Sequence, residues 1–302
     1  KKLGSFGIGM NPEFLKEGDA IDDFMFPDRI VIGFEDEKTK LLLNEMYSPW
    51  DCDKLYVNSR TAEMIKYSNN TILACQISIN NELSNLASKI GGIDYMDVIN
   101  GVSLDKRWSP IINNKRIKPQ ILSYFTPGAG FGGSCFPKDV QAIRTQGELI
   151  GVDMLMTNSI LSVNEKQPQQ VLEMLSKFPV NQKTVLLLGL AFKPDTDDIR
   201  ESSSIKILKL LLENEYKVTA HDPIAIKNTK KEIINDNLKF QQYWRNEIEN
   251  NNIIIVGTNW EEYKVLKKIL NKITQTKVIV DCKRLFKSSE IKNHRYLTFG
   301  NN

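Results

Sequence analysis

The sequence is poor in cysteine, and this limits what its thiols can do. Only four occur in 302 residues, at Cys52, Cys75, Cys135 and Cys282, and no two of them form a C-x-x-C pair. Such wide spacing argues against a disulfide framework and against a cysteine-ligated zinc site. We therefore expect reduced thiols, a cytoplasmic location and no bound metal.

Histidine is rarer still, with only His221 and His294 in the whole chain. Both lie in the C-terminal third, far along the sequence from Cys135. A catalytic pair of cysteine and histidine is therefore disfavoured. His221 follows a strand-like run, and we interpret it as a cap of that strand.

An excess of charge of one sign and a long apolar run are also missing. The chain has 40 Lys and Arg against 37 Asp and Glu, a net charge of +3, which does not favour nucleic acid as a partner. Local basic clusters can still hold a phosphate. No apolar run approaches the length of a membrane span, and "KKLGSFGIGMNPEF" lacks the apolar core of a signal peptide. We therefore expect no membrane partner.

The hydrophobic pattern of the first two thirds predicts mostly helices. Up to residue 57, the strand-like "RIVIGF" and "DKLYVNS" and a short helix around "KTKLLLNEMY" are too few to close a domain. Residues 59–92 predict a long helix that Ser59 caps and Gly91–Gly92 end. Further helices are expected around "IDYMDVING", "KDVQAIRTQGELIG" and "NSILSVNEKQPQQVLEMLSKF", which makes the middle of the chain all-helical.

The last third changes to a period typical of strands. "KTVLLLGLAF", "YKVTAHDP", "NNIIIVGTNW" and "KVIVDCKRLF" alternate with helices such as "SSSIKILKLLLENE" and "EEYKVLKKILNK". This alternation predicts an α/β domain with a doubly wound parallel sheet. Ligands of such sheets bind beyond the C-terminal ends of the strands, where Lys193, Arg200, Lys283 and Arg284 can meet a phosphate.

The stretch "GAGFGGSCFPKDV", residues 128–140, carries the strongest chemical signal. Four glycines let the backbone turn tightly and approach a ligand. Pro137 fits the first turn of a helix, so Cys135 is expected at a helix N-terminus, beside Lys138, where an anion such as a thiolate is favoured. We favour a nucleophile at Cys135 over a small core residue. Asp139 follows four residues later.

Two other pairs share the four-residue spacing that places side chains on one face of a helix. Glu13 and Glu17 alone are more typical of a solvated face. Lys66 and Asn70 lie near the start of a helix that otherwise reads as buried. A cation and an amide side by side can stabilise an oxyanion, but a surface corner of the helix is an equal alternative from spacing alone.

Four stretches resemble the UDP-glucose 6-dehydrogenase family, within the nucleotide-sugar dehydrogenases. They are "NPEFLKEGDAIDDFMFPDRIVIG", "KYSNN", "GFGGSCFPKD" and "GLAFKPDTDDIRESSS", which occur in the family's order and cover the chain nearly end to end. The resemblance implies a two-step oxidation of the sugar C6 alcohol to a carboxylate with two NAD+, through an aldehyde and a cysteine thioester.

The resemblance also implies roles for individual residues. Cys135 would be the nucleophile, Lys66 and Asn70 would stabilise the oxyanions, Asp139 would position water or assist proton transfer, and Glu13 would act as a base in hydrolysis. The implied contacts to UDP-glucose come from Glu13, Phe14, Leu15, Lys16, Glu17, Lys66, Asn70, Arg107, Gly130, Phe131, Gly132, Phe192, Lys193 and Lys283. Those to NAD come from Glu17, Lys138 and Arg200, while Arg107 would reach the site of a neighbouring subunit.

Two departures from the family pattern stand out. Lys283, in "DCKR", occupies a position where the family commonly has arginine, and a lysine lacks the bidentate fork. No G-x-G-x-x-G follows a strand, so most of the N-terminal NAD-binding domain is expected to be missing. The expected division is a remnant of that domain at 1–57, a helical dimerisation and catalytic domain at 58–178 and a UDP-binding α/β domain at 179–302.

Two alternatives to UDP-glucose oxidation stay open. One is a non-catalytic nucleotide-sugar-binding or assembly subunit, and the other is oxidation of another sugar nucleotide such as GDP-mannose, whose enzymes tend to have leucine where Phe136 stands. The long helix is also expected to form a homodimer or higher homo-oligomer through its apolar positions. These are Ile72, Leu73, Ile77, Ile79, Leu83 and Leu86.

Overall fold

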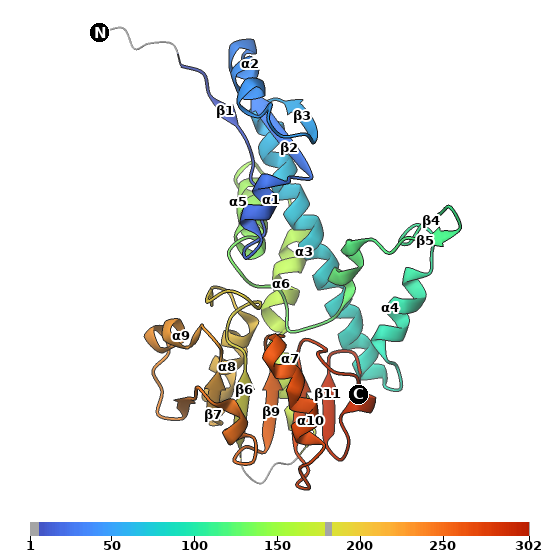
Figure 1. Cartoon of the computed structure of the whole chain (residues 1–302), viewed down its shortest axis with the longest axis vertical. Coiled ribbons are helices and arrows are strands. Elements are labelled where there is room, and N and C mark those ends of the chain that lie inside the picture. The colour runs from blue at the N-terminus through green and yellow to red at the C-terminus, as the bar shows by residue number, and fades with distance from the viewer. Residues whose placement is uncertain (1–5, 179–182, 302) are drawn as a thin grey trace. The chain divides into compact units, whose positions relative to one another are not determined.

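The computed structural model describes residues 6–178 and 183–301 (Figure 1). Its backbone divides into two compact units, Lys1–Ile72 and Leu73–Asn302, which we call the N-terminal unit and the C-terminal unit. Within the described ranges, no helix combines the length and apolar character that crossing a membrane requires. The finer division into three domains at residues 57 and 178 stays a proposal.

The N-terminal unit is built on a three-stranded sheet. The buried run Ile30–Ile32 lies on the central strand, β2, with β1 antiparallel on one side and β3 parallel on the other. Between β2 and β3, helix α2 begins where the carboxylate of Asp36 accepts from the Thr39 backbone N–H at 2.9 Å. The elements are β1 (Gly9–Met10), α1 (Ala20–Met25), β2 (Arg29–Phe34), α2 (Glu37–Met46) and β3 (Asp53–Val57).

The long helix expected at residues 59–92 is confirmed as α3 (Ser59–Ile90), which ends before Gly91–Gly92. The predicted cap was wrong by one residue. Asn58 Oδ1 accepts from the backbone N–H of Thr61 at 2.8 Å, while Ser59 is already the first helical residue. A cap must precede the helix with its acceptor near the third N–H, which Asn58 satisfies.

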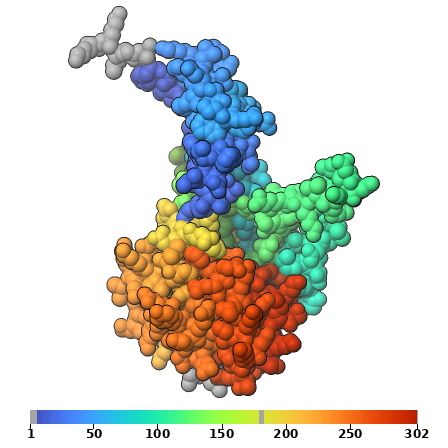
Figure 2. All heavy atoms as spheres, in the orientation of Figure 1, coloured from blue at the N-terminus to red at the C-terminus, as the bar shows by residue number. Residues whose placement is uncertain are grey.

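The rest of the central segment is helical, as predicted, with two exceptions. The polar stretch after α4 forms a short hairpin whose exposed residues 111–118 stand away from the helices of the same unit (Figures 1 and 2). The last expected helix is interrupted at Pro168, which has no N–H to continue it. The elements are α4 (Tyr95–Ser103), β4 (Ile111–Ile112), β5 (Lys115–Arg116), η1 (Gln120–Phe125), α5 (Phe136–Leu149), α6 (Leu155–Lys166) and α7 (Gln169–Ser176).

The last third forms the expected doubly wound sheet, with all six strands parallel in the order β11-β10-β9-β6-β7-β8. Two edge strands, β8 and β11, were not predicted. The strands are β6 (Thr184–Leu188), β7 (Lys217–His221), β8 (Leu238–Phe240), β9 (Ile253–Val256), β10 (Val278–Asp281) and β11 (Arg295–Thr298). The intervening turns and helices are α8 (Ser203–Glu213), α9 (Ile226–Glu232), η2 (Trp244–Glu247), η3 (Glu261–Val265), α10 (Leu266–Leu270) and η4 (Ser288–Glu290).

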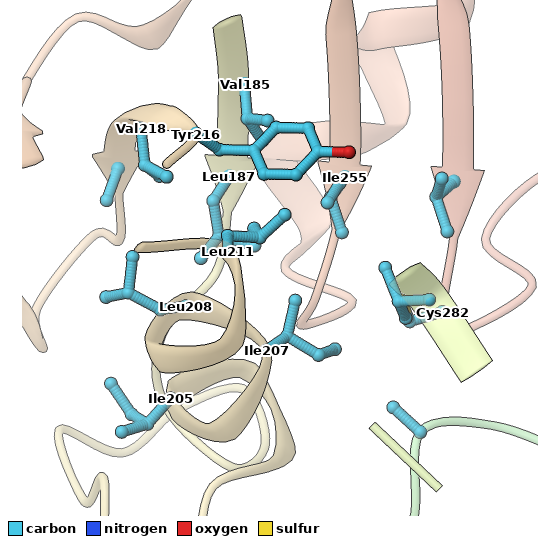
Figure 3. Close-up of a cluster of buried hydrophobic side chains, with 14 of the residues drawn as sticks. Val185, Leu187, Ile205, Ile207, Leu208, Leu211, Tyr216, Val218, Ile255 and Cys282 are labelled. Atoms are coloured by element: carbon cyan, nitrogen blue, oxygen red, sulfur yellow. The ribbon is translucent and has the colours of Figure 1, made fainter. Parts of the chain in front are cut away.

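Both faces of this sheet are buried, as the continuous apolar strands predict. Val185 and Leu187 of β6 belong to a core cluster with residues of α7 and α8, and Figure 3 shows Leu187 beside Leu211 of α8 and Val185 beside Tyr216. The alternate residues of β6 face the opposite layer, built on η2, η3 and α10. From β6 the chain continues to β7 and β8 on one side, and it then returns to β9 on the other side of β6. The strand order therefore reverses between β6 and β9, and such sheets bind ligands in the crevice at the carboxyl ends of these two strands.

Candidate active site

The N-terminal unit pairs two of the predicted catalytic residues. The Lys66 amine, on α3, donates to Glu13 Oε2 at 2.5 Å and to the Glu13 carbonyl at 2.6 Å. The other carboxylate oxygen of Glu13 accepts from the Leu15 backbone N–H at 3.0 Å. The Lys66 side chain is 17% exposed and that of Glu13 51%. The shielded cation therefore fixes a glutamate that still faces solvent and can accept a proton.

The neighbouring side chains of the glutamate stretch are fixed inside the same unit. The ring of Phe14 lies under the guanidinium of Arg29, 4.1 Å from its centroid. Lys16 is exposed and donates to Asp23 at 3.2 Å, and this hydrogen bond raises the pKa of the Lys16 amine. The two contacts give the stretch a defined backbone path on both sides of Leu15.

Of the two pairs in this unit that are four residues apart, only one lies on a helix. Lys66 and Asn70 lie one turn apart on α3, where the Asn70 side-chain oxygen accepts from Asn69 Nδ2 at 3.4 Å. Glu13 and Glu17 precede α1 and are not on a helix, so their spacing does not place them on one helical face. Glu17 is half-buried.

In the C-terminal unit, Cys135 occupies the expected position at a helix N-terminus. It is the residue before α5, whose first turn contains Pro137. Its side chain is half-buried, and its sulfur lies 3.8 Å from the hydroxyl oxygen of Ser134. The free N–H groups of a helix N-terminus stabilise an anion, so this position suits a nucleophilic thiolate.

Asp139 lies one turn into α5, and its backbone N–H donates to the Cys135 carbonyl at 2.9 Å. Its side chain is 2% exposed, and the amine of Lys138 is 3.5 Å from its Oδ1. A carboxylate buried to this extent needs polar or charged partners, and the adjacent lysine supplies one. Asp139 is therefore fixed below Cys135 rather than on a solvated face.

The glycine loop, residues 128–134, packs against the segment that joins β6 to α8. The Gly133 N–H donates to the Arg200 carbonyl at 3.0 Å. Gly133 has φ +81°, and a Cβ there would lie 2.7 Å from the ring of Phe192. Only glycine permits both this conformation and this approach. The packing brings Gly132 and Gly133 of the loop next to Phe192, which precedes Lys193 in the chain.

A cavity of about 810 Å³ opens beside the glycine loop. Lys138 and Arg200, both expected to contact the cofactor, line it together. Arg200 forms a bidentate pair with Asp198, the shortest distance being 2.7 Å. Burial opposes the charged form of Asp198, but these hydrogen bonds outweigh it and lower the pKa of the carboxyl.

A third cation in this cavity, Lys206 on α8, was not predicted. Its amine is 2.7 Å from Glu165 and 3.0 Å from Glu201. Burial alone would lower the pKa of Lys206, but the two carboxylates reverse this and raise it. The three residues are separated by up to 41 positions in the sequence, so no local motif marks them.

Lys283 and Arg107 lie outside the residues that line this cavity. Lys283 follows β10, and burial lowers the pKa of its amine. A Cβ at Gly128 would be 3.0 Å from the carbonyl of the preceding Cys282, so the glycine loop passes beside this strand end. Arg107 is exposed and donates to Asp105 at 2.5 Å, which lowers the pKa of that carboxyl to about 2.

The histidine interpretation needs a correction, because His221 is the last residue of β7 and not a cap beyond it. It is buried, with its Nδ1 2.8 Å from the Tyr263 hydroxyl and its Nε2 3.8 Å from Glu262.

Arg284 was also expected near a phosphate. It contacts the Phe299 carbonyl and lies 3.5 Å from Asp94. Among the described residues, no three His, Cys, Asp or Glu side chains gather as a metal site.

The predicted residues thus gather in two groups. Glu13 to Glu17, Lys66 and Asn70 belong to the N-terminal unit, and Cys135, Asp139 and the glycine loop belong to the C-terminal unit. Each group is fixed within its own unit by the contacts above. A common catalytic centre of the two groups is therefore a matter for proposal.

Models of three domains of one family match the sequence in order. The NAD binding domain of the UDP-glucose/GDP-mannose dehydrogenase family matches residues 1–51, its central domain 60–166 and its UDP binding domain 186–288. The NAD binding match lies in the N-terminal part of the chain, where a part of that domain was expected. Together the three matches extend over most of the chain.

Several named proteins are similar over most of the chain. A UDP-glucose 6-dehydrogenase of Rickettsia conorii is 33% identical over 303 residues, which are 98% of this chain and 67% of the relative. The YwqF UDP-glucose 6-dehydrogenase of Bacillus subtilis is 37% identical over 262 residues, 86% of this chain and 56% of the relative. A solved UDP-glucose dehydrogenase structure from Pyrobaculum islandicum has a TM-score of 0.82 and 38% identity, covering 96% of this chain and 63% of that one. The chain spans about two thirds of the length of such relatives.

Proposed function

Because the chain belongs to the UDP-glucose/GDP-mannose dehydrogenase family, we propose that it takes part in the NAD-dependent oxidation of UDP-glucose to UDP-glucuronate at C6. The observation that carries the proposal is Cys135 at the first turn of α5, at the end of the glycine loop. Relatives of 33% and 38% identity that bear the UDP-glucose dehydrogenase name support the choice of sugar nucleotide.

Cys135 is the nucleophile of the proposed reaction. The C6 alcohol first loses a proton and a hydride and becomes an aldehyde. The Cys135 sulfur then bonds to C6, and the carbonyl oxygen takes up a proton to give a thiohemiacetal. Loss of a second hydride and a proton leaves a thioester on Cys135. Water adds at C6, the C6–sulfur bond breaks, and the carboxylate is released with the thiol restored.

Four further side chains are proposed to stabilise charge or transfer protons in these steps: Lys66, Asn70, Glu13 and Asp139. The Lys66 amine and the Asn70 amide are donors for the oxyanions formed when sulfur or water adds to C6. Glu13 accepts the proton of the attacking water, and its pairing with Lys66 at 2.5 Å holds the carboxylate in place for that task. Asp139 orients water beside Cys135 from its buried position on α5.

The cofactor of the reaction is NAD, which accepts one hydride in each oxidation when bound. Two cationic side chains suit its anionic pyrophosphate: Lys138 and Arg200 line one cavity and are 71% and 67% exposed. Their partners Asp139 and Asp198 keep them at its wall. Glu17, in the N-terminal unit, is the third residue proposed to contact NAD.

The proposed contacts to UDP-glucose follow from the resemblance of individual residues to the family pattern. Residues Glu13 to Glu17 with Lys66 and Asn70 hold the sugar, and the backbone of Gly130 to Gly132 with Phe192 and Lys193 holds the glycosyl diphosphate. Lys283 follows β10 at the C-terminal edge of the parallel sheet, where nucleotides bind. Arg107 is proposed to reach the site of a second subunit, in a homodimer or larger homo-oligomer.

The covalent step can be tested without hydride transfer. The 6-aldehyde of UDP-glucose should add to the Cys135 thiol, protect it from iodoacetamide and be retained by the unaltered chain more tightly than UDP-glucose. The Cys135→Ser variant should bind UDP-glucose unchanged in calorimetry but lose the extra affinity for the aldehyde. If the chain binds GDP-mannose more tightly than UDP-glucose, the proposed substrate becomes GDP-mannose. Binding of UDP-glucose without aldehyde addition would favour a non-catalytic subunit.

A further inference from the structure

Three buried amide side chains hold the backbone of the glycine loop. Asn164 Oδ1 accepts from the Phe131 N–H at 2.7 Å, and its Nδ2 donates to the Phe131 carbonyl at 3.0 Å. At the start of the loop, Asn81 Oδ1 accepts from the Gly128 N–H at 2.9 Å, and Gln167 Nε2 donates to the Gly128 carbonyl at 2.9 Å. The backbone N–H and C=O of both Gly128 and Phe131 are thus hydrogen-bonded to side-chain amides.

These amides come from positions far from the loop in sequence and deep in the C-terminal unit. Asn81 lies on α3 and Asn164 on α6, and Gln167 immediately follows α6. They are 0%, 7% and 1% exposed. Gln167 also accepts from Asn85 Nδ2 at 2.9 Å, which links α3 to the end of α6 behind the loop. Burial at this level makes the geometry specific, because an unpaired buried amide costs free energy.

The loop sequence is matched to these amides. Gly130 has φ +101°, and a Cβ there would lie 2.6 Å from Asn164 Oδ1. Asn164 can therefore reach both polar groups of Phe131 only while residue 130 has no side chain. Within the described residues, the N–H groups of Gly130 and Gly132 make no hydrogen bond. The amides thus fix Gly128 and Phe131, and Phe131 lies between the two backbone donors, of Gly130 and Gly132, that stay open to a ligand.

We propose that Asn164, supported by Asn81 and Gln167, is a positioning residue that holds the glycine loop in the shape that binds the nucleotide sugar beside Cys135. This inference rests on the proposed function. In the proposed reaction, Asn164 contacts neither the substrate nor the Cys135 sulfur. It acts through the backbone of Gly130 to Gly132. Its amide is required because one group must accept from Phe131 N–H and another must donate to Phe131 C=O.

The first experiment measures how UDP-glucose protects Cys135 from iodoacetamide in the 302-residue chain. The quantity is the UDP-glucose concentration that halves the alkylation rate of the Cys135 peptide. In Asn164→Leu and in Gln167→Met, which lose the amides at similar size, this concentration should rise at least about tenfold, as loss of ~1.4 kcal/mol of binding would produce. Asn80→Leu is the matched control. Asn80 is a buried amide on α3 that bonds to Tyr95 and Gln76 and not to the loop.

A second variant remains informative if the apolar ones fail to fold. Asn164→Asp keeps the shape and the acceptor but, when ionised, loses the donor to the Phe131 carbonyl. A protonated carboxylic acid regains one O–H donor. The quantity compared is the ratio of the half-protecting concentration of Asn164→Asp to that of the unaltered chain at the same pH. This ratio should be well above one at pH 8 and return towards one at pH 5.5. Asn164→Leu should show no such recovery, which separates positioning from a general loss of stability.

The outcomes separate the inference from the function on which it rests. Absence of protection in the unaltered chain would overturn the proposed function, and the inference with it. If UDP-glucose protects the unaltered chain, and Asn164→Leu and Asn164→Asp are protected at the same concentration, the inference alone is overturned. An equal rise in Asn80→Leu would do the same, because a buried amide without a bond to the loop would then have the same effect.

Discussion

At the scale of single residues, the four cysteines lie in four different environments. Cys282 is fully buried after β10, and burial raises the pKa of its thiol to about 12. Cys52 and Cys75 are half-buried, the first in a turn and the second within α3. Only Cys135 combines partial exposure with the N-terminus of a helix of fourteen residues. The thiolate attacks electrophiles, so reactivity should follow access and stabilisation of the anion.

We therefore predict that Cys135 reacts with iodoacetamide at neutral pH faster than the other three, and that Cys282 reacts most slowly. Peptide mapping by mass spectrometry at increasing times gives the four rates. Cys135→Ser should remove the fast phase and leave the remaining rates unchanged. A map in which Cys135 is the least labelled of the four would reject it as the nucleophile.

Residue types predicted Cys135, its helix and the surrounding glycines because these features are local. The Glu13–Lys66 ion pair was not predicted as a contact, although both residues were singled out, because 53 positions separate them. The loop contacts of Asn164 span 33 positions, and a single asparagine within a helix has no sequence signature. Buried polar contacts of this kind depend on tertiary packing, which periodicity does not encode.

At the scale of secondary-structure elements, β7 and η3 share a buried polar contact. His221 of β7 faces Tyr263 of η3 at 2.8 Å, with Glu262 at 3.8 Å and the ring of Trp244 nearby. Burial lowers the pKa of His221 below 6.5, against the opposing effects of Glu262 and Asp222. The folded protein therefore favours the neutral ring more than the unfolded chain does.

This difference predicts a pH-dependent stability. The contribution of the neutral ring is fully present above about pH 6.5, the ordinary pKa, and is lost as the pH falls through the lower folded value. The urea midpoint followed by circular dichroism should thus fall between pH 7.5 and pH 5. His221→Gln should reduce that slope, whereas His294→Gln should leave the part due to His221 intact. Equal slopes for the unaltered chain and His221→Gln would contradict this prediction.

A second feature at this scale is the apolar face of α3. Ile79, Leu83 and Leu86 are 42%, 44% and 56% exposed, at spacings that place them on one face. Ile77, another of the apolar positions expected at the dimer interface, instead packs inside the C-terminal unit and does not belong to this face. Exposed apolar faces of this kind are typical of interfaces between subunits.

We predict that two copies pair through this face of α3 in a two-fold dimer. Light scattering at tens of micromolar should give the mass of a dimer, and Leu83→Glu should give that of a monomer, because it places a charge in the interface. Leu149→Glu changes a residue that is 77% exposed at the end of α5 and should remain dimeric. A monomer for the unaltered chain would rule out the interface.

Elements were predictable where their apolar pattern was clear. The 32 residues of α3 and the central apolar strands have a clear period, and both were predicted. β8 and β11 have three and four residues, and neither has an uninterrupted apolar run. Their place at the sheet edges leaves only one hydrogen-bonded neighbour strand each, so less burial is needed to form them.

At the scale of the whole molecule, the nucleotide-sugar and cofactor parts of the chemistry are unequally represented. The UDP binding domain model matches 103 residues at 186–288, whereas the NAD binding domain model matches only residues 1–51. The 302 residues contain no G-x-G-x-x-G after a strand. That glycine-rich turn and the helix after it are what hold a dinucleotide pyrophosphate in such domains.

We predict that a polypeptide of these 302 residues binds UDP-glucose but forms almost no NADH. Hydride transfer requires the nicotinamide to be held against C6, and this proximity contributes roughly 7–11 kcal/mol to lowering the barrier. Supplying the NAD-binding domain of a relative, fused or as a separate chain, should restore NADH formation. The restored activity should vanish in Cys135→Ser and persist in Cys52→Ser. Rapid NAD+ reduction by the 302 residues alone would show that Lys138, Arg200 and their neighbours hold the cofactor without that domain.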